Sequence, residues 1–274
     1  MIDVLRLIRA HNLLIAAAGV VAGGWIARGA IVLPIVLVWA AVSAAGFGAA
    51  GNARNDLADA PADRVNRPPS ERPFARGRVR RGTLDLCVAG GAFVGCLGAA
   101  LVSGWAVLVG LAALAAMIAY SPYLKRTGLA GNVVVSVVSG LPLFYGALAV
   151  GNAAAGLVPW ALAAWLHLAR ELTKDVDDVE GDRLVGRRTL AVTLGPGPAA
   201  RIASLVSFWF VPVSVALPWA AGYGAAYFPA AAPAQVLALG AGLRLRRGRA
   251  GRVSFALKVA MVLGLVALTL GRVW

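Results

Sequence analysis

The chain has 274 residues, 60% of them hydrophobic, and its mean hydropathy of +0.78 lies far above that of a water-soluble globular domain. Its 26 Lys and Arg residues against 12 Asp and Glu give a net charge of +14, a balance often seen in nucleic-acid-binding proteins. These charges lie beside long apolar stretches, where membrane topology and anionic lipid account for them. Composition therefore predicts an all-α, integral membrane protein with a single domain over residues 1–274, and no nucleic-acid partner.

Apolar stretches long enough to cross a membrane follow one another along the chain. They cover residues 11–27, 31–51, 83–102, 105–120, 132–150, 157–172, 199–219, 225–243 and 253–271. If the amino terminus is cytoplasmic, the inward-facing segments contain every basic residue except Arg28 and Arg272. Lys and Arg near short loops are retained on that side. The charge pattern therefore supports a bundle of nine transmembrane helices in the cell membrane.

Nine of the twelve acidic residues gather in two short segments at the cytoplasmic ends of apolar stretches. Three aspartates of the first segment recur with the same spacing in the second, 119 residues later, so we interpret the chain as a weak internal repeat with halves of about 1–130 and 131–274. Positions i, i+3 and i+7 share one helix face, so each set should direct its oxygens toward one point. Hard oxygen ligands around one cavity favour Mg²⁺. The six residues are Asp56, Asp59 and Asp63, then Asp175, Asp178 and Asp182.

Arginines directly follow each acidic segment in the sequence. Arg64 abuts Asp63, and Arg183 abuts Asp182. Membrane topology explains the outer arginines, but guanidinium groups placed against carboxylates suggest a polyanionic ligand between them. Carboxylates, a divalent metal and guanidinium groups together bind and polarise a diphosphate. A diphosphate substrate at the cytoplasmic side is therefore expected.

Two further segments carry polar residues. Tyr120 and Lys125 lie in a third inward-facing loop, where Lys125 is a candidate phosphate contact and Tyr120 a candidate partner for a developing cation; both are also typical interfacial anchors. His167, Glu171 and Asp175 are spaced four apart and are expected to share a helix face. For His167, a hydrogen-bonded core position is the more common role.

Taken together, these motifs resemble the UbiA superfamily of intramembrane prenyltransferases. The resemblance covers both halves in the expected order and implies a nine-helix bundle, open laterally to lipid, in which two aspartate motifs hold Mg²⁺ and a prenyl diphosphate. The matching segments are Arg9 with Asn12, N-D-x-x-D-x-x-x-D over Asn55 to Asp63, Asn66-Arg67-Pro68, Tyr120-Ser121 with Lys125, K-D-x-x-D-x-x-G-D over Lys174 to Asp182, and G-x-x-T-L over Gly186 to Leu190.

Site roles follow from the resemblance, position by position. It implies that all six clustered aspartates are metal ligands. It implies catalytic roles for Asp59, Asp63, Asp178, Asp182 and Tyr120, and diphosphate contacts for Arg9, Asn55, Arg64, Lys125 and Lys174. Pro61 departs from the pattern, because it removes a backbone donor and disfavours a regular helix, and it is expected to disturb the placement of Asp63.

The function implied by the resemblance is Mg²⁺-dependent transfer of a polyprenyl group from a prenyl diphosphate to a lipophilic acceptor. The motifs look most like the branch that prenylates geranylgeranylglyceryl phosphate in ether-lipid synthesis. An aromatic-acceptor prenyltransferase, a terpene cyclase of the same fold and a divalent-cation or anion transporter stay open, although a transporter should carry its ionisable groups near mid-membrane. Four glycines are expected to leave room for the prenyl tail between helices, namely Gly46, Gly48, Gly140 and Gly146.

Overall fold

The computed structural model describes residues 2–68 and 71–273, so Pro69 of the basic loop and Trp274 lie outside the described residues. The described residues form α-helices and two short 3-10 helices, and no β-strand. In chain order the elements are α1 (Ile2–Leu7), α2 (Ala10–Arg28), α3 (Ile35–Asn66), α4 (Arg81–Ala100), α5 (Gly104–Tyr120), η1 (Leu124–Thr127), α6 (Leu129–Ala149), η2 (Ala153–Gly156), α7 (Leu157–Asp177), α8 (Val179–Leu184), α9 (Leu190–Leu194), α10 (Pro196–Ala220), α11 (Tyr227–Arg246) and α12 (Val253–Val273). The predicted all-α class is confirmed.

Each predicted apolar stretch overlaps one long helix. In the part of the chain that the structure describes, six of these helices are long and apolar enough to cross a membrane, namely α2, α3, α4, α6, α10 and α12. Helix α5 is apolar but shorter. Helix α7 carries Arg170, Glu171 and Lys174 within its last turns, which lowers its hydropathy. The chain is thus a multi-pass membrane protein, while the count of nine spans and the internal repeat stay predictions.

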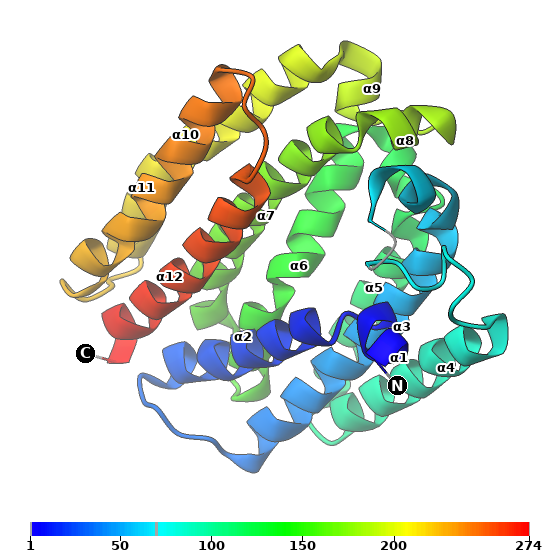
Figure 1. Ribbon diagram of the computed structural model, residues 1–274. Coiled ribbons are helices and arrows are strands. Elements are labelled where there is room, and N and C mark those ends of the chain that lie inside the picture. Colours follow the sequence, from blue (N-terminus) through cyan, green and yellow to red (C-terminus); the bar gives the residue numbers. More distant parts are fainter. Residues whose placement is uncertain (1, 69–70, 274) are drawn as a thin grey trace.

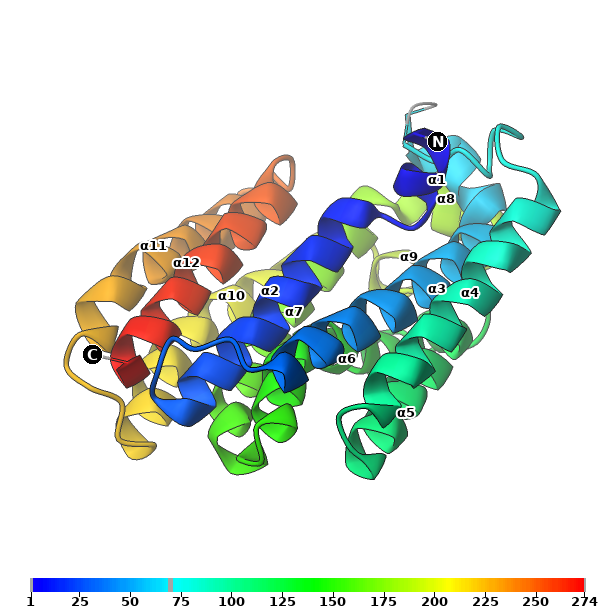
Figure 2. The ribbon, with the colours of Figure 1, turned by 90° about the horizontal axis from the view of Figure 1, so that it is seen from below.

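The long helices pack side by side (Figures 1 and 2). Contacts join α2 to α3 and α12, α3 to α5, α5 to α6, α6 to α7, and α7 to α10, while α11 lies between α10 and α12. Helix α4 packs on the outside of α3. Many apolar side chains on the outer faces are exposed, among them Phe93 on α4, Trp209 on α10 and Phe255 on α12. In water such a surface would be unfavourable, but in a bilayer it contacts lipid.

Both acidic segments lie where helices extend beyond their apolar stretches. Helix α3 continues without interruption from Ile35 through Pro61 to Asn66, so the expected disturbance at Pro61 is not found. The second segment differs from the expected single helix face. Helix α7 ends at Asp177, Asp178 connects it to α8, and the chain changes direction there with φ −99° and ψ 6°. Asp175 and Asp182 therefore belong to different helices.

Three of the four glycines expected to leave room for a tail instead allow helices to pack closely. A Cβ atom on Gly46 would lie 2.5 Å from the backbone nitrogen of Gly95, and one on Gly146 would meet the backbone of Val20. Gly140 likewise faces the backbone of Ala164, with its Cβ position 2.8 Å from that nitrogen. Small residues at such positions allow close backbone approach between membrane helices. Only Gly48 faces a flexible side chain, that of Leu13.

Candidate active site

A cavity of about 1130 Å³ opens among α2, α3, α5, α6, α7 and α12. Its wall combines the charged ends of α3 and α7 with apolar side chains such as Leu13, Phe47, Val138, Phe210 and Leu265. A polar head and a long apolar body could therefore occupy the same space. Ligand pockets commonly combine an apolar wall with a few well-placed polar groups.

The carboxylates of the first segment are each held by an arginine. Asp56 is 1% exposed and accepts a hydrogen bond of 2.8 Å from Arg9, which adopts a left-handed backbone conformation between α1 and α2. Asp63 accepts a hydrogen bond of 2.9 Å from Nε of Arg72. Arg72 belongs to the loop after α3, so this loop folds back over the segment that precedes it.

The three recurring aspartates of the second segment also have partners. Asp175 accepts a hydrogen bond of 2.7 Å from the side chain of Asn132 on α6. Asp178 forms an ion pair with Arg67, which lies directly after α3. Burial raises the pKa of Asp178 above its ordinary value, although the charge of Arg67 acts in the opposite direction. The carboxylate therefore depends on positive charge nearby to remain ionised.

Arg187 joins the two acidic segments. Its guanidinium group forms an ion pair with Asp59 of α3 and donates a hydrogen bond of 3.0 Å to Asp182 of α8. Lys125 reaches the same carboxylate at 3.2 Å. Burial opposes the charge of Arg187, but the carboxylates of Asp59 and Asp182 raise its pKa above the ordinary value, so it stays protonated. Residues far apart in the sequence thus form one charged network.

A second link between the halves runs through Asn66 at the end of α3. Its side chain donates a hydrogen bond of 3.0 Å to the carbonyl oxygen of Asp178 and accepts one of 3.0 Å from the backbone N–H of Gly181. A Cβ atom on Gly181 would lie 2.5 Å from the amide group of Asn66. The glycine is therefore required for the end of α3 to contact α8 this closely.

Most of the predicted site residues line the cavity, and three do not. The lining residues are Arg9, Asn55, Asp59, Asp63, Tyr120, Lys125, Lys174, Asp175 and Asp178. Asp56 and Asp182 lie behind the wall, each covered by its basic partners. Arg64 is exposed, donates to the carbonyl oxygen of Ala75 and does not line the cavity, so the structure does not bring it together with the other predicted site residues.

Within the described ranges 2–68 and 71–273, no three acidic, histidine or cysteine side chains form a group that could hold a metal ion. The six predicted metal ligands are therefore not brought into one cluster, because basic and amide side chains separate them. Several oxygens nevertheless keep free acceptor capacity. Buried oxygens without a hydrogen-bond partner are Oδ1 of Asn55, Oδ2 of Asp56, Oδ1 of Asp178 and Oδ2 of Asp182.

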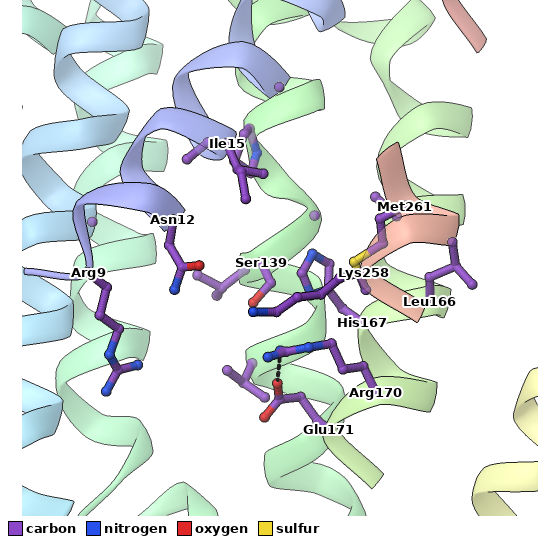
Figure 3. Close-up of a pocket in the computed structure, with 18 of the residues that line it drawn as sticks. Arg9, Asn12, Ile15, Ser139, Leu166, His167, Arg170, Glu171, Lys258 and Met261 are labelled. Atoms are coloured by element: carbon purple, nitrogen blue, oxygen red, sulfur yellow. Dashed lines mark hydrogen bonds and ion pairs between the residues drawn. The ribbon is translucent and has the colours of Figure 1, made fainter. Parts of the chain in front are cut away.

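Lys174, an expected diphosphate contact, has a closer partner. Its Nζ lies 2.8 Å from Glu171, whose other oxygen lies 2.8 Å from Arg170. Figure 3 shows the Arg170–Glu171 pair with His167 and Lys258 on one side of the cavity and Arg9 on the other.

Sequence reasoning left several of these partners out of the predicted site. Arg72, Arg187 and Asn132 were not among the predicted site residues, since their partners lie on other elements of the chain. Lys258 lies inside an apolar stretch of α12. A lone lysine within an apolar stretch is itself a functional signal, because ionisable groups are costly there.

Comparison with known proteins points to the same family as the sequence motifs. The profile of the UbiA prenyltransferase family matches residues 16–266. A digeranylgeranylglyceryl phosphate synthase of Methanopyrus kandleri is 38% identical over 272 residues, covering 96% of this chain and 96% of that protein.

Two solved structures share the fold. A UbiA homolog from Aeropyrum pernix K1 has a TM-score of 0.82 at 22% identity, over 94% of this chain and 96% of that one. A UbiA homolog from Archaeoglobus fulgidus bound to DMAPP and Mg²⁺ has a TM-score of 0.68 at 18% identity, over 97% of this chain and 99% of that one.

Proposed function

Because this chain belongs to the UbiA prenyltransferase family, we propose that it transfers a prenyl group from a prenyl diphosphate to geranylgeranylglyceryl phosphate, within the membrane. The observation that carries the proposal is the cavity, in which two acidic segments and their basic partners adjoin a large apolar wall. The name of the Methanopyrus kandleri relative supports the glyceryl phosphate acceptor.

The residues present fit a divalent cation. The unpartnered oxygens of Asn55, Asp56, Asp178 and Asp182 are hard ligands of the kind that Mg²⁺ prefers. We propose that Asn55 and Asp178, with Asp59 and Asp63, hold the metal from the cavity wall and that a bound diphosphate completes its coordination. When bound, Mg²⁺ neutralises charge on the departing diphosphate.

The basic residues of the site would also neutralise charge on the departing diphosphate. Arg9 and Lys125 line the cavity next to the acidic segments and can donate to phosphate oxygens. In the transfer, the bond between the prenyl C1 and the diphosphate oxygen breaks and the diphosphate leaves with the electron pair. The acceptor hydroxyl oxygen then bonds to C1, and its proton passes to a carboxylate that lines the cavity. The apolar wall excludes water, which would otherwise capture the allylic cation.

The case for each alternative function differs. Membership of a prenyltransferase family sets the transporter aside. A terpene cyclase would need no acceptor, and an aromatic-acceptor enzyme would use a neutral ring or a benzoate. The orientation of the site toward the cytoplasm follows from the positive charges around it and belongs to this proposal.

The proposal is tested with purified protein in detergent, a radiolabelled prenyl diphosphate and one candidate acceptor at a time. We expect a radiolabelled ether product with geranylgeranylglyceryl phosphate only when Mg²⁺ is present, and none after chelation with EDTA. Asp59→Asn should lower the rate by about 100-fold or more, because it removes charge from the diphosphate site. Asp85→Asn is the matched control, since Asp85 is exposed on α4 and pairs with Arg81.

Two results would contradict the assignment. Transfer to an aromatic acceptor alone would place the chain in that branch of the family. Release of diphosphate with a cyclic product and no acceptor would identify a cyclase.

A further inference from the structure

Three basic residues form a second charged group in the cavity, where α7 lies against α12. Arg170 and Lys174 project from α7 and Lys258 from α12, and all three line the cavity. We name them the α7–α12 basic cluster. Figure 3 shows Arg170 and Lys258 close to His167 and Ser139, across the cavity from Arg9.

The α7–α12 basic cluster carries more positive charge than its surroundings neutralise. Glu171 is its nearest acidic partner and lies 2.8 Å from both Arg170 and Lys174. Lys258 forms no ion pair or hydrogen bond with any of the residues that the structure describes, although the charges of Arg170, Lys174, Glu171 and Glu71 act on it. Three positive charges thus face two carboxylates, those of Glu171 and Glu71. Beside an apolar wall, an uncompensated charge of this size is costly unless an anion balances it.

Free donors and acceptors accompany this charge. Nε of Arg170 and Nδ1 of His167 are buried and have no hydrogen-bond partner. Buried polar atoms are satisfied in nearly all cases, so such atoms gathered beside a cavity indicate a ligand that is bound during function. The ligand should accept several hydrogen bonds and carry negative charge. A phosphate monoester, with a charge of about −1.5 to −2 and three acceptor oxygens, meets both conditions.

The diphosphate of the prenyl donor already has its own basic partners. Arg9, Lys125 and Arg187 surround the two aspartate segments, while the α7–α12 basic cluster lies on the α12 side of the cavity. The cavity therefore offers two separate places for anionic groups. A transfer between two substrates that both bear phosphate requires two such places.

We propose that the α7–α12 basic cluster binds the phosphate monoester of the prenyl acceptor, with Lys258 as its free cation. This inference rests on the proposed function and names the part of the site that selects a phosphorylated acceptor over a neutral or aromatic one. A membrane phospholipid offers related chemistry, but its phosphate is a diester with a single negative charge. A comparison of binding of a phosphate monoester and a phosphate diester separates the two ligands.

The experiment measures binding and kinetics in parallel. Binding is measured by isothermal titration calorimetry in detergent with an alkylglycerol phosphate, the same alkylglycerol without phosphate, and phosphatidylglycerol. We expect the phosphate monoester to bind wild-type protein most tightly. Lys258→Gln should weaken this binding by about tenfold to a hundredfold, as expected for the loss of a hydrogen bond to a charged group. Lys258→Arg should retain most of it.

The matched control is Arg246→Gln, which removes one positive charge from the exposed end of α11, outside the cavity. It should bind the monoester as wild type does. In the transfer assay, Lys258→Gln should raise KM for the phosphorylated acceptor by about tenfold or more and leave KM for the prenyl diphosphate within about twofold. Binding does not require turnover, so it tests the cluster even if transfer to the glyceryl phosphate fails.

Three outcomes would overturn the inference. Equal binding of the monoester by wild type and Lys258→Gln would show that the cluster does not hold it. A rise in KM for the prenyl diphosphate alone would assign the cluster to the donor. Equal binding of phosphatidylglycerol and the monoester, both weakened by Lys258→Gln, would assign it to membrane lipid.

Discussion

Each of the six aspartates that recur between the two acidic segments contacts a basic or amide side chain. Such pairing lowers the cost of burying the carboxylates, and it also keeps the two segments together before any substrate binds. Arg187 has the largest role, because it is 5% exposed and contacts Asp59 and Asp182 at once. Positive charge from a metal ion would compensate the same carboxylates, so Arg187 and Mg²⁺ should partly replace one another.

We predict that Arg187→Gln lowers stability when no metal is present, by about 3–5 kcal/mol, because it leaves two buried carboxylates without their partner. Addition of Mg²⁺ should then raise the melting temperature of the variant more than that of wild type. Thermal unfolding of the detergent-solubilised protein, with Mg²⁺ and with EDTA, measures both effects. Arg183→Gln serves as control, since Arg183 is exposed on α8. An equal Mg²⁺ effect in all three proteins would contradict the prediction.

Helices α3 and α4 approach one another closely along a row of glycines. A Cβ atom on Gly91 would lie 2.8 Å from both the backbone nitrogen of Ala50 and the carbonyl oxygen of Gly46. This contact fixes the outer side of α3, the helix that carries the first acidic segment at its far end. The position of Asp59 in the cavity therefore depends on residues that never touch a substrate.

Neighbouring glycines on α4 provide a test of this packing. Gly91→Ala should destabilise the protein by about 1–3 kcal/mol, as expected when extra atoms are forced into a packed contact. Gly90→Ala should be neutral or stabilise by about 0.5–1 kcal/mol, since nothing lies within 4 Å of its Cβ position and alanine favours the helix. Thermal unfolding of the two variants measures both changes in stability. Similar melting temperatures would mean that α3 and α4 can move apart freely.

For the molecule as a whole, the charges determine how the bundle lies in the membrane. Both acidic segments, the basic loop after α3 and the ends of α1 and α8 lie at the same end of the structure (Figure 1). Most arginines lie in or beside the segments at that end. On the basis of the positive-inside rule, we propose that this end faces the cytoplasm. The substrates would then meet the charged part of the cavity from the cytoplasmic leaflet.

Thiol labelling tests this orientation. In a background with Cys87→Ser and Cys96→Ser, Arg246→Cys and Ala225→Cys place single thiols near opposite ends of α11 at exposed positions. A membrane-impermeant maleimide should label Arg246→Cys only in inside-out vesicles and Ala225→Cys only in right-side-out vesicles. The reverse pattern would place the acidic segments outside.

Much of this protein could be predicted from its sequence, because the relevant signals are local. Apolar stretches located every long helix, since a helix that faces lipid must be apolar over its whole length. The spacing of Asp56, Asp59 and Asp63 and its recurrence in the second half indicated where the site lies. Pro61 disfavours a regular helix, yet helix α3 runs through it to Asn66.

The amino-acid sequence alone determined the helical class, the membrane setting and the two acidic segments, because each depends on residues close together in the chain. Only the tertiary structure decided which cation meets which carboxylate, and that Arg64 turns away while Arg187 joins the two segments. It also placed Lys258 beside Arg170, from helices that are far apart in sequence. Such pairings result from how the helices pack, and no local pattern of residues specifies a contact between distant segments.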